Sequence, residues 1–253
     1  MSGGWFDNGS RRFYNDVMTP LTPSRSRRRR AGSLAVRLAL KRVADVVFSG
    51  TALVVLAPAF ALIAVAIVVA SPGPVFFKQE RTGRGGKPFF IWKFRTMVRD
   101  AAALGPSITG AGDPRVTRVG HFLRATKLDE LPNLVNVVKG EMSIVGPRPD
   151  LPRFMTALTA DQRLVLAFRP GVTGPTQIRY IAEEEMLSPV NIDENYVENV
   201  FRDKITSDLA YVKNWSLRRD AALVVYTAVA LLFKILGRAT RTFPPGAPAG
   251  DKR

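Results

Sequence analysis

The chain contains no cysteine among its 253 residues and only one histidine, His121. Without cysteine there is no disulfide, no thiolate nucleophile and no sulfur-ligated zinc site, and this absence suits a reducing compartment. A single histidine also excludes metal sites that need several, such as the HExxH motif. Any chemistry must therefore use carboxylates, hydroxyls, lysine, arginine or a bound cation.

Acidic residues are also scarce, because 21 Asp and Glu stand against 37 Lys and Arg and leave a formal net charge of +16. Residues 1–42 hold ten Lys or Arg against two Asp, a local charge of +8. The run SRSRRRR has no apolar side chain to bury and indicates a disordered basic arm. Such charge calls for a polyanion. We favour anionic membrane lipid and no nucleic acid, because no nucleic-acid-binding module is recognisable and no aromatic residue interrupts the arginine run.

A long uncharged segment follows the arm, over residues 46–70. As one straight helix it would measure roughly 38 Å, against ~30 Å for a bilayer's hydrocarbon core. It is apolar on every face, which favours a membrane over a soluble core. Pro58 lies at its midpoint and forces a bend. Because both flanks are basic, we favour a re-entrant hairpin that bends at Pro58 over a kinked span.

The remaining pattern predicts an α/β fold that is mostly helical with a small amount of strand: a membrane-embedded re-entrant helix hairpin plus a compact cytosolic catalytic domain. Strands at 75–78 and 89–94 are expected to form a hairpin. Helices are expected at about 116–125, 130–139, 150–166 and 193–204, and an interfacial helix at 221–236. The predicted division is 1–33 disordered basic tail, 34–72 membrane-associated re-entrant helix, 73–206 catalytic domain, and 207–253 C-terminal interfacial helix and tail.

The motif TKLDELPN places two carboxylates, Asp129 and Glu130, side by side. Proline is tolerated only in the first turn of a helix, so Pro132 predicts a helix that begins near these acids. Asp129 would then lie at or beside the N-cap, where the positive end of the helix dipole keeps a carboxylate ionised and also suits a bound phosphate. The alternative is that Asp129 merely caps the helix and Glu130 is solvated.

Adjacent carboxylates repel each other unless a cation lies close to them. The nearby sequence offers several cations: Arg124, Lys127 and Arg148, the last in the stiff loop GPRP, with Lys93 and Arg95 in WKFRTM and also Arg118. A divalent cation would meet the same need, and oxygen ligands with phosphate suit Mg²⁺.

The ordered motifs resemble the bacterial sugar transferase family, over residues 38–236. They are KRVADVVFSG, SPGPVFFKQERTGRGGKPFFIWKFRTM, RVGHFLRATKLDELPNLVNVVKGEMSIVGPRPD and RPGVTGPTQI. Members are monotopic phosphoglycosyl transferases that move a sugar 1-phosphate from a UDP-sugar donor to a polyprenyl (undecaprenyl) phosphate acceptor. The resemblance implies that Asp129 is the nucleophile, which expels UMP and holds the sugar phosphate as an acyl phosphate.

The same resemblance assigns further roles. Glu130 would hold the required Mg²⁺, with Asp129 as a second candidate ligand, or would assist proton transfer. Arg124 and Arg148 match phosphate-contacting positions, and Lys93, Arg95 and Arg118 match motifs of the family.

The resemblance also places the chain on the cytoplasmic face of the bacterial inner membrane, at the first membrane step of a glycan pathway. The sugar stays open among hexose, N-acetylhexosamine and diamino-sugar, and a homodimer through the C-terminal elements is compatible with the sequence. The alternative from a different class is a membrane-anchored basic scaffold that binds anionic lipid or nucleic acid.

Overall fold

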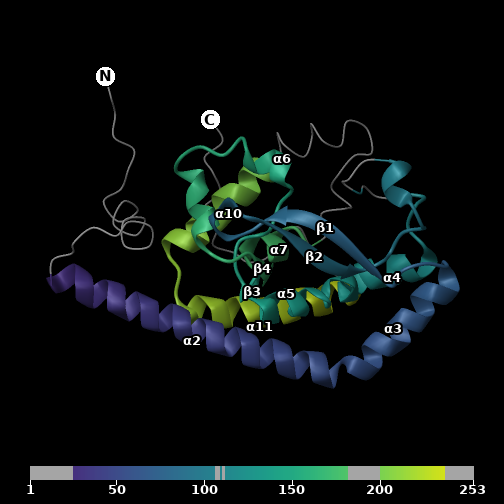
Figure 1. The fold of residues 1–253 in the computed structure, drawn as a ribbon, viewed down its shortest axis with the longest axis horizontal. Coiled ribbons are helices and arrows are strands. Elements are labelled where there is room, and N and C mark those ends of the chain that lie inside the picture. Colours follow the sequence, from purple (N-terminus) through teal and green to yellow (C-terminus); the bar gives the residue numbers. More distant parts are fainter. Residues whose placement is uncertain (1–24, 106–108, 110–111, 182–199, 237–253) are drawn as a thin grey trace.

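The structure is a computed structural model that describes residues 25–105, 109, 112–181 and 200–236 (Figure 1). The described elements are α2 (Arg25–Val55), α3 (Ala57–Ala70), β1 (Phe76–Thr82), η1 (Arg84–Gly86), β2 (Pro88–Phe94), η2 (Ala101–Ala103), α4 (Arg118–Thr126), η3 (Leu128–Glu130), α5 (Asn133–Lys139), β3 (Ser143–Val145), α6 (Pro152–Met155), η4 (Gln162–Ala167), β4 (Gly171–Thr173), α7 (Pro175–Arg179), α10 (Arg202–Lys213) and α11 (Leu217–Ile235). The prediction of a mostly helical fold with little strand is confirmed.

The uncharged segment forms a bent pair of helices, α2 and α3, and the helix direction changes by 61° at the break between them. Pro58 is the second residue of α3, where its missing N–H costs nothing, but its ring prevents α2 from continuing. No single helix in the described ranges is long and apolar enough to cross a membrane, whereas this pair together is, by length and composition. Figure 1 shows the pair along the lower edge of the molecule, with the bend directed away from the other elements.

Much of this pair lies outside the protein core. The side chains of Val54, Leu62 and Val69 are 76%, 73% and 80% exposed. A helix of a soluble core would bury such residues, so the exposed apolar surface calls for an apolar surrounding.

Two small sheets carry the loops of interest. β1 pairs with β2 as an antiparallel hairpin, in the register Lys78 opposite Trp92, and this confirms the hairpin predicted from the sequence. β3 and β4 form a short parallel pair that the sequence pattern did not predict. Three-residue strands are too short to display a period of two.

The predicted helix over 150–166 is wrong, because the structure has two short helices, α6 and η4, in its place. The cause lies in the intervening segment, where Thr159 and Gln162 exchange reciprocal hydrogen bonds that begin a separate turn. The helix predicted at about 193–204 falls mostly outside the described residues, and α10 is described from Arg202.

Buried apolar clusters hold the helices against the sheets. One cluster joins Ile67 of α3, Phe94 of β2 and Leu123 of α4. The edge-to-face contact of Phe60 with Phe94, whose ring centroids lie 5.2 Å apart, adds to it. The second arm of the bent pair is therefore docked beside β2 and α4, the elements that carry the site described next.

Candidate active site

Asp129 and Glu130 lie in η3, a 3₁₀ turn between α4 and α5. Lys127 adopts a left-handed conformation with φ of 59°, which ends α4 and starts this turn. The α-helix begins only at Asn133 with Pro132 as its N-cap, so the prediction that Asp129 lies at or beside the N-cap is wrong. The left-handed Lys127 starts the 3₁₀ turn that carries both acids, and the α-helix follows only after Pro132.

The Asp129 carboxylate is buried and partly unsatisfied. The residue is only 7% exposed, and its Oδ1 atom has no hydrogen-bond partner. Burial raises its pKa, and this effect outweighs the opposing influence of the Lys93 ammonium. A buried carboxylate oxygen without a donor is costly, so its presence calls for an explanation such as a ligand or a reaction.

Glu130 has the opposite electrostatic setting, although it is the next residue. Its Oε1 accepts a hydrogen bond from Lys93 Nζ at 2.7 Å. Burial by itself would raise the pKa of Glu130, but Lys93, Lys127 and Arg148 bring it well below its usual range. Glu130 therefore remains an anion throughout the physiological pH range.

Both acids line a cavity of about 610 Å³, which we call the catalytic cavity. Several cationic side chains line it with them, among them Lys93, Arg124, Lys127 and Arg148. Arg124 is held by a bond from its Nε to Thr96 Oγ1 at 2.8 Å. Gly120 makes this approach feasible, since a Cβ there would lie 1.9 Å from the Thr96 carbonyl oxygen. A cavity of this size, lined by cations, suits a phosphorylated ligand.

Arg148 is positioned through its own backbone. Its N–H donates to Asp208 Oδ2 at 2.8 Å, and Thr176 Oγ1 donates to the other carboxylate oxygen at 2.5 Å. Burial raises the pKa of Asp208 to about 7, against the lowering effect of these two donors. The GPRP loop is thus tied to α10, 60 residues further along the chain.

The other two predicted cations, Arg95 and Arg118, are placed differently. Arg95 lines the catalytic cavity, but its guanidinium donates to the carbonyls of Ser71 and Pro72, at the end of α3. Arg118 begins α4 with an exposed side chain and is not among the residues that line the cavity. The structure therefore brings Lys93, Arg124 and Arg148 to the cavity of the acid pair, turns the guanidinium of Arg95 toward the end of α3, and leaves Arg118 outside.

Sequence reasoning missed one acid and two polar partners at this site. Asp150 lines the cavity and is 3% exposed, with its Oδ1 3.7 Å from Arg81 Nη1. Its place directly after GPRP was the only sequence signal. Asp208 and Thr176 gave none, because their role arises from packing between α10 and α7.

The acid pair fits a magnesium ion that is completed by a substrate. The described residues contain no group of three or more His, Cys, Asp or Glu side chains that would enclose a metal by themselves. Mg²⁺ is usually held by one or two carboxylates together with substrate phosphates, and the unpartnered Asp129 Oδ1 offers such a ligand. The site as a whole defines an enzyme that handles phosphate groups beside a buried carboxylate.

The comparisons with known proteins agree with this class. The family described as bacterial sugar transferase matches residues 36–234, so the chain belongs to that family. The resemblance drawn from the motifs is thus confirmed.

Three relatives illustrate the family. A Caulobacter vibrioides protein named UDP-glucose:undecaprenyl-phosphate glucose-1-phosphate transferase is 40% identical over 76% of this chain and 69% of its own length. A Rhizobium leguminosarum protein named exopolysaccharide production protein PSS is 39% identical over 77% of this chain and 96% of its length. An Aeromonas hydrophila protein is 35% identical over 76% of this chain and 44% of its own length. It is named UDP-N-acetylgalactosamine-undecaprenyl-phosphate N-acetylgalactosaminephosphotransferase.

Proposed function

We propose that this protein transfers a sugar 1-phosphate from a UDP-sugar to undecaprenyl phosphate and releases UMP. The observation that carries the proposal is the Asp129 carboxylate, which is buried, keeps one oxygen without a hydrogen-bond donor and borders a cavity lined by cations. Family membership and the activities named for the relatives support the same reaction.

In the first half-reaction a carboxylate oxygen of Asp129 attacks the β-phosphorus of the donor. A bond forms between the carboxylate oxygen and phosphorus, and the bond from phosphorus to the bridging oxygen breaks. UMP leaves with that electron pair, and the sugar phosphate remains on Asp129 as an acyl phosphate. An ionised carboxylate is a competent covalent nucleophile.

In the second half-reaction an oxygen of undecaprenyl phosphate attacks the same phosphorus. The bond between phosphorus and the Asp129 oxygen breaks, which regenerates the carboxylate and yields the undecaprenyl diphosphate sugar. UMP departs as an anion and the acceptor attacks as an anion, so neither half-reaction consumes a net proton.

This balance favours a charge-holding role for Glu130 over proton transfer. Its pKa lies well below the usual range, so it carries no proton to donate near neutral pH. When bound by Asp129 and Glu130, Mg²⁺ would supply positive charge to the phosphate oxygens. Arg124 and Arg148 offer guanidinium groups to the two phosphates of the donor, and Lys93 keeps Glu130 ionised.

The acceptor lipid requires the catalytic cavity to lie at the bilayer surface. We infer that α2 and α3 enter the membrane, bend at Pro58 and leave by the same face, the cytoplasmic face of the inner membrane. The bend of 61° and the exposed apolar side chains support this placement.

The absence of cysteine allows a direct test of this topology. Ser33→Cys and Lys87→Cys introduce single thiols at exposed positions, in α2 ahead of the uncharged segment and between β1 and β2. A membrane-impermeant maleimide is expected to label both only in inverted vesicles. Labelling from opposite sides would indicate a span instead.

The donor is expected among UDP-hexoses and UDP-N-acetylhexosamines, since the relatives are named for UDP-glucose and UDP-N-acetylgalactosamine. The name of the Rhizobium relative supports a role in exopolysaccharide formation. These assignments extend the reaction class to a substrate and a pathway.

The deciding experiment measures UMP release by purified protein in nanodiscs with Mg²⁺, undecaprenyl phosphate and a panel of UDP-sugars. UMP is expected from one donor, and Asp129→Asn is expected to abolish it without loss of membrane binding. Glu80→Gln, which removes an exposed carboxylate outside the cavity, is the matched control. Silence across the panel from folded protein would favour the basic scaffold, whose main binding activity would disappear on deletion of residues 1–33.

A further inference from the structure

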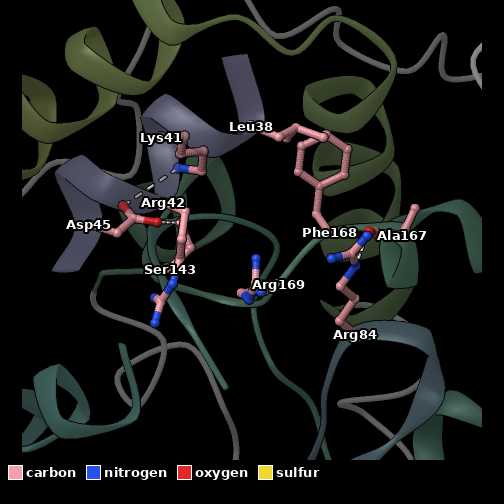
Figure 2. A pocket seen from close by; sticks show the side chains of 9 residues that line it. All are labelled: Leu38, Lys41, Arg42, Asp45, Arg84, Ser143, Ala167, Phe168 and Arg169. Atoms are coloured by element: carbon pink, nitrogen blue, oxygen red, sulfur yellow. Dashed lines mark hydrogen bonds and ion pairs between the residues drawn. The ribbon is translucent and has the colours of Figure 1, made fainter. Parts of the chain in front are cut away.

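A second cavity, of about 50 Å³, lies between α2, the β1–β2 turn and the segment after η4 (Figure 2). It shares no lining residue with the catalytic cavity. Its polar lining consists of Lys41, Arg42, Asp45, Arg84, Ser143 and Arg169. We call it the arginine pocket.

The single acid of the arginine pocket is already occupied by neighbours. Asp45 accepts hydrogen bonds from Ser143 Oγ at 2.7 Å and from the Ile144 N–H at 3.3 Å, and Lys41 Nζ lies 3.9 Å away. Lys41 pairs more closely with Asp220, at 2.7 Å. The three arginines therefore provide an excess of positive charge that Asp45 does not neutralise.

Two of these arginines are aimed by their Nε atoms and keep their terminal nitrogens available. Arg84 Nε donates to the Ala167 carbonyl at 3.1 Å, and Arg169 Nε donates to the Gly140 carbonyl at 2.8 Å. Within the described residues, the hydrogen bonds of both side chains are made by Nε and none by the terminal nitrogens. Figure 2 shows both guanidinium groups at the pocket.

Arg42, the third arginine of the pocket, has both terminal nitrogens bound to the protein backbone. Its Nη1 and Nη2 donate to the carbonyls of Val137 and Val138, at the end of α5. Partial burial lowers the pKa of Arg169, and repulsion by the charges of Arg84 and Arg42 lowers it further. An anion between them would relieve that repulsion.

The pocket lies beside the apolar surface of α2. Lys41, Arg42 and Asp45 are on the side of the helix that lines the pocket, whereas Val43 and Val47 on the opposite side are 61% and 62% exposed. A helix with its side chains is about 10 Å across. If that apolar side meets lipid, as proposed above, then the pocket lies at the depth of the headgroups.

We propose that Arg84 and Arg169 form a second anion site that holds one phosphate group at the membrane surface, apart from the catalytic cavity. A cavity of this size holds about four water-sized groups, which suits a phosphate but not a nucleotide or a sugar. Guanidinium groups bind phosphate oxygens through paired N–H donors. The phosphate belongs either to a phospholipid headgroup or to free inorganic phosphate, and the two arms of the test separate these sources.

The test compares the full-length protein with Arg84→Gln/Arg169→Gln. The matched control is Lys87→Gln/Arg218→Gln, which removes the same charge from exposed positions outside the pocket. In the lipid arm, native mass spectrometry counts phosphatidylglycerol retained from nanodiscs of phosphatidylcholine and phosphatidylglycerol. In the second arm, inorganic phosphate is titrated into delipidated protein in detergent at constant ionic strength.

The pocket variant is expected to retain about tenfold less phosphatidylglycerol than the native protein, and the control less than about twofold less. A loss confined to the inorganic phosphate arm would also support the site and assign it to free phosphate. Equal behaviour of pocket variant and control in both arms would overturn the proposal. Arg84 is exposed, so Arg84→Gln alone repeats the test with little risk to folding.

Because neither arm measures sugar transfer, the test is independent of the proposed function. Protein that releases UMP but shows no difference between variant and control would refute only the second site. Protein that binds phosphate through Arg84 and Arg169 but releases no UMP from any donor would refute only the proposed reaction.

Discussion

The catalytic cavity and the arginine pocket both gather cations from distant parts of the chain, but they differ in which group is left without a partner. In the catalytic cavity it is a carboxylate oxygen, Asp129 Oδ1. In the arginine pocket it is the terminal nitrogens of Arg84 and Arg169, within the described residues. An unsatisfied acid among cations suits a nucleophile for a phosphorylated substrate, whereas unsatisfied cations suit a receptor for an anion.

Among the tests of this difference, the largest loss of activity is expected from Glu130→Gln. The change removes the anion that neutralises Lys93 and that would help to hold Mg²⁺. We expect kcat to fall by about 10²–10³, the usual cost of one electrostatic group at a reacting centre. Steady-state UMP release measures it, with Glu80→Gln as the control. A kcat close to the native value would show that the second acid of the motif has no part in the reaction.

A smaller effect is expected from Lys93→Met, which we expect to lower activity about tenfold near neutral pH. Lys93 lowers the pKa of both acids, so its loss raises both values and leaves less ionised Asp129 at a given pH. The acidic limb of the pH profile should therefore move to higher pH. The profile of kcat against pH tests this, and Lys87→Met is the matched control. An unmoved limb would contradict the assigned electrostatic role.

The third test concerns the hydrogen bond between the Arg148 N–H and Asp208, which holds the GPRP loop in position. Asp208→Ala removes the acceptor of the Arg148 N–H, and we expect kcat/KM to fall about tenfold as the loop loses its position. Asp208→Asn keeps an oxygen acceptor and should retain most of the activity. Equal losses in the two variants would argue against positioning through this hydrogen bond.

Asp208 also makes stability depend on pH in a defined direction. Its pKa is about 7 in the folded protein and ~4 in an unfolded chain. Between these values the folded protein holds the proton and the unfolded chain does not, so stability falls as pH rises from about 4 to about 7. Thermal unfolding of Asp208→Asn across this range should show a weaker decline than the native protein. An identical decline would mean that other groups cause it.

The smallest effect concerns the support of the arginine pocket. Ser143→Ala removes one donor to the buried Asp45 and should reduce the free energy of unfolding by about 1–2 kcal/mol. Thr206→Ala, which removes an exposed hydroxyl on α10, should cost less than about 0.5 kcal/mol. Unfolding of both variants in the same detergent makes the comparison, and equal costs would show that the Asp45 carboxylate is not supported in this way.

The parts of the fold that were predictable are those encoded by neighbouring residues. Pro58 within an uncharged run predicted the bend between α2 and α3, and short apolar and aromatic segments around glycines predicted the β1–β2 hairpin. The predicted start of the helix after Asp129 was wrong because Lys127 takes a left-handed conformation. Lysine rarely adopts this conformation, and the neighbouring sequence gives no indication of it. The parallel pairing of β3 with β4 was missed because it depends on a contact between distant segments.

The candidate site likewise has residues that the sequence predicted and contacts that only the packing of distant segments creates. The acid pair and the two arginines of its flanking motifs were identified from the motif and from the resemblance to the family. The partnership of Lys93 with Glu130 depends on how the hairpin packs against η3, and that of Arg148 with Asp208 depends on the docking of α10. Such pairs lie 37 and 60 residues apart, beyond the reach of any periodic pattern.

The sequence by itself determined which chemistries are excluded, where the apolar segment bends and which two carboxylates stand together. These properties depend on residue type and on local backbone geometry. Only the tertiary structure decided that one carboxylate oxygen of Asp129 has no hydrogen-bond donor while Glu130 is paired with Lys93, and that Arg84 and Arg169 line the same separate pocket. Burial and long-range hydrogen bonds set those outcomes, because they arise when segments far apart in the chain are packed against each other.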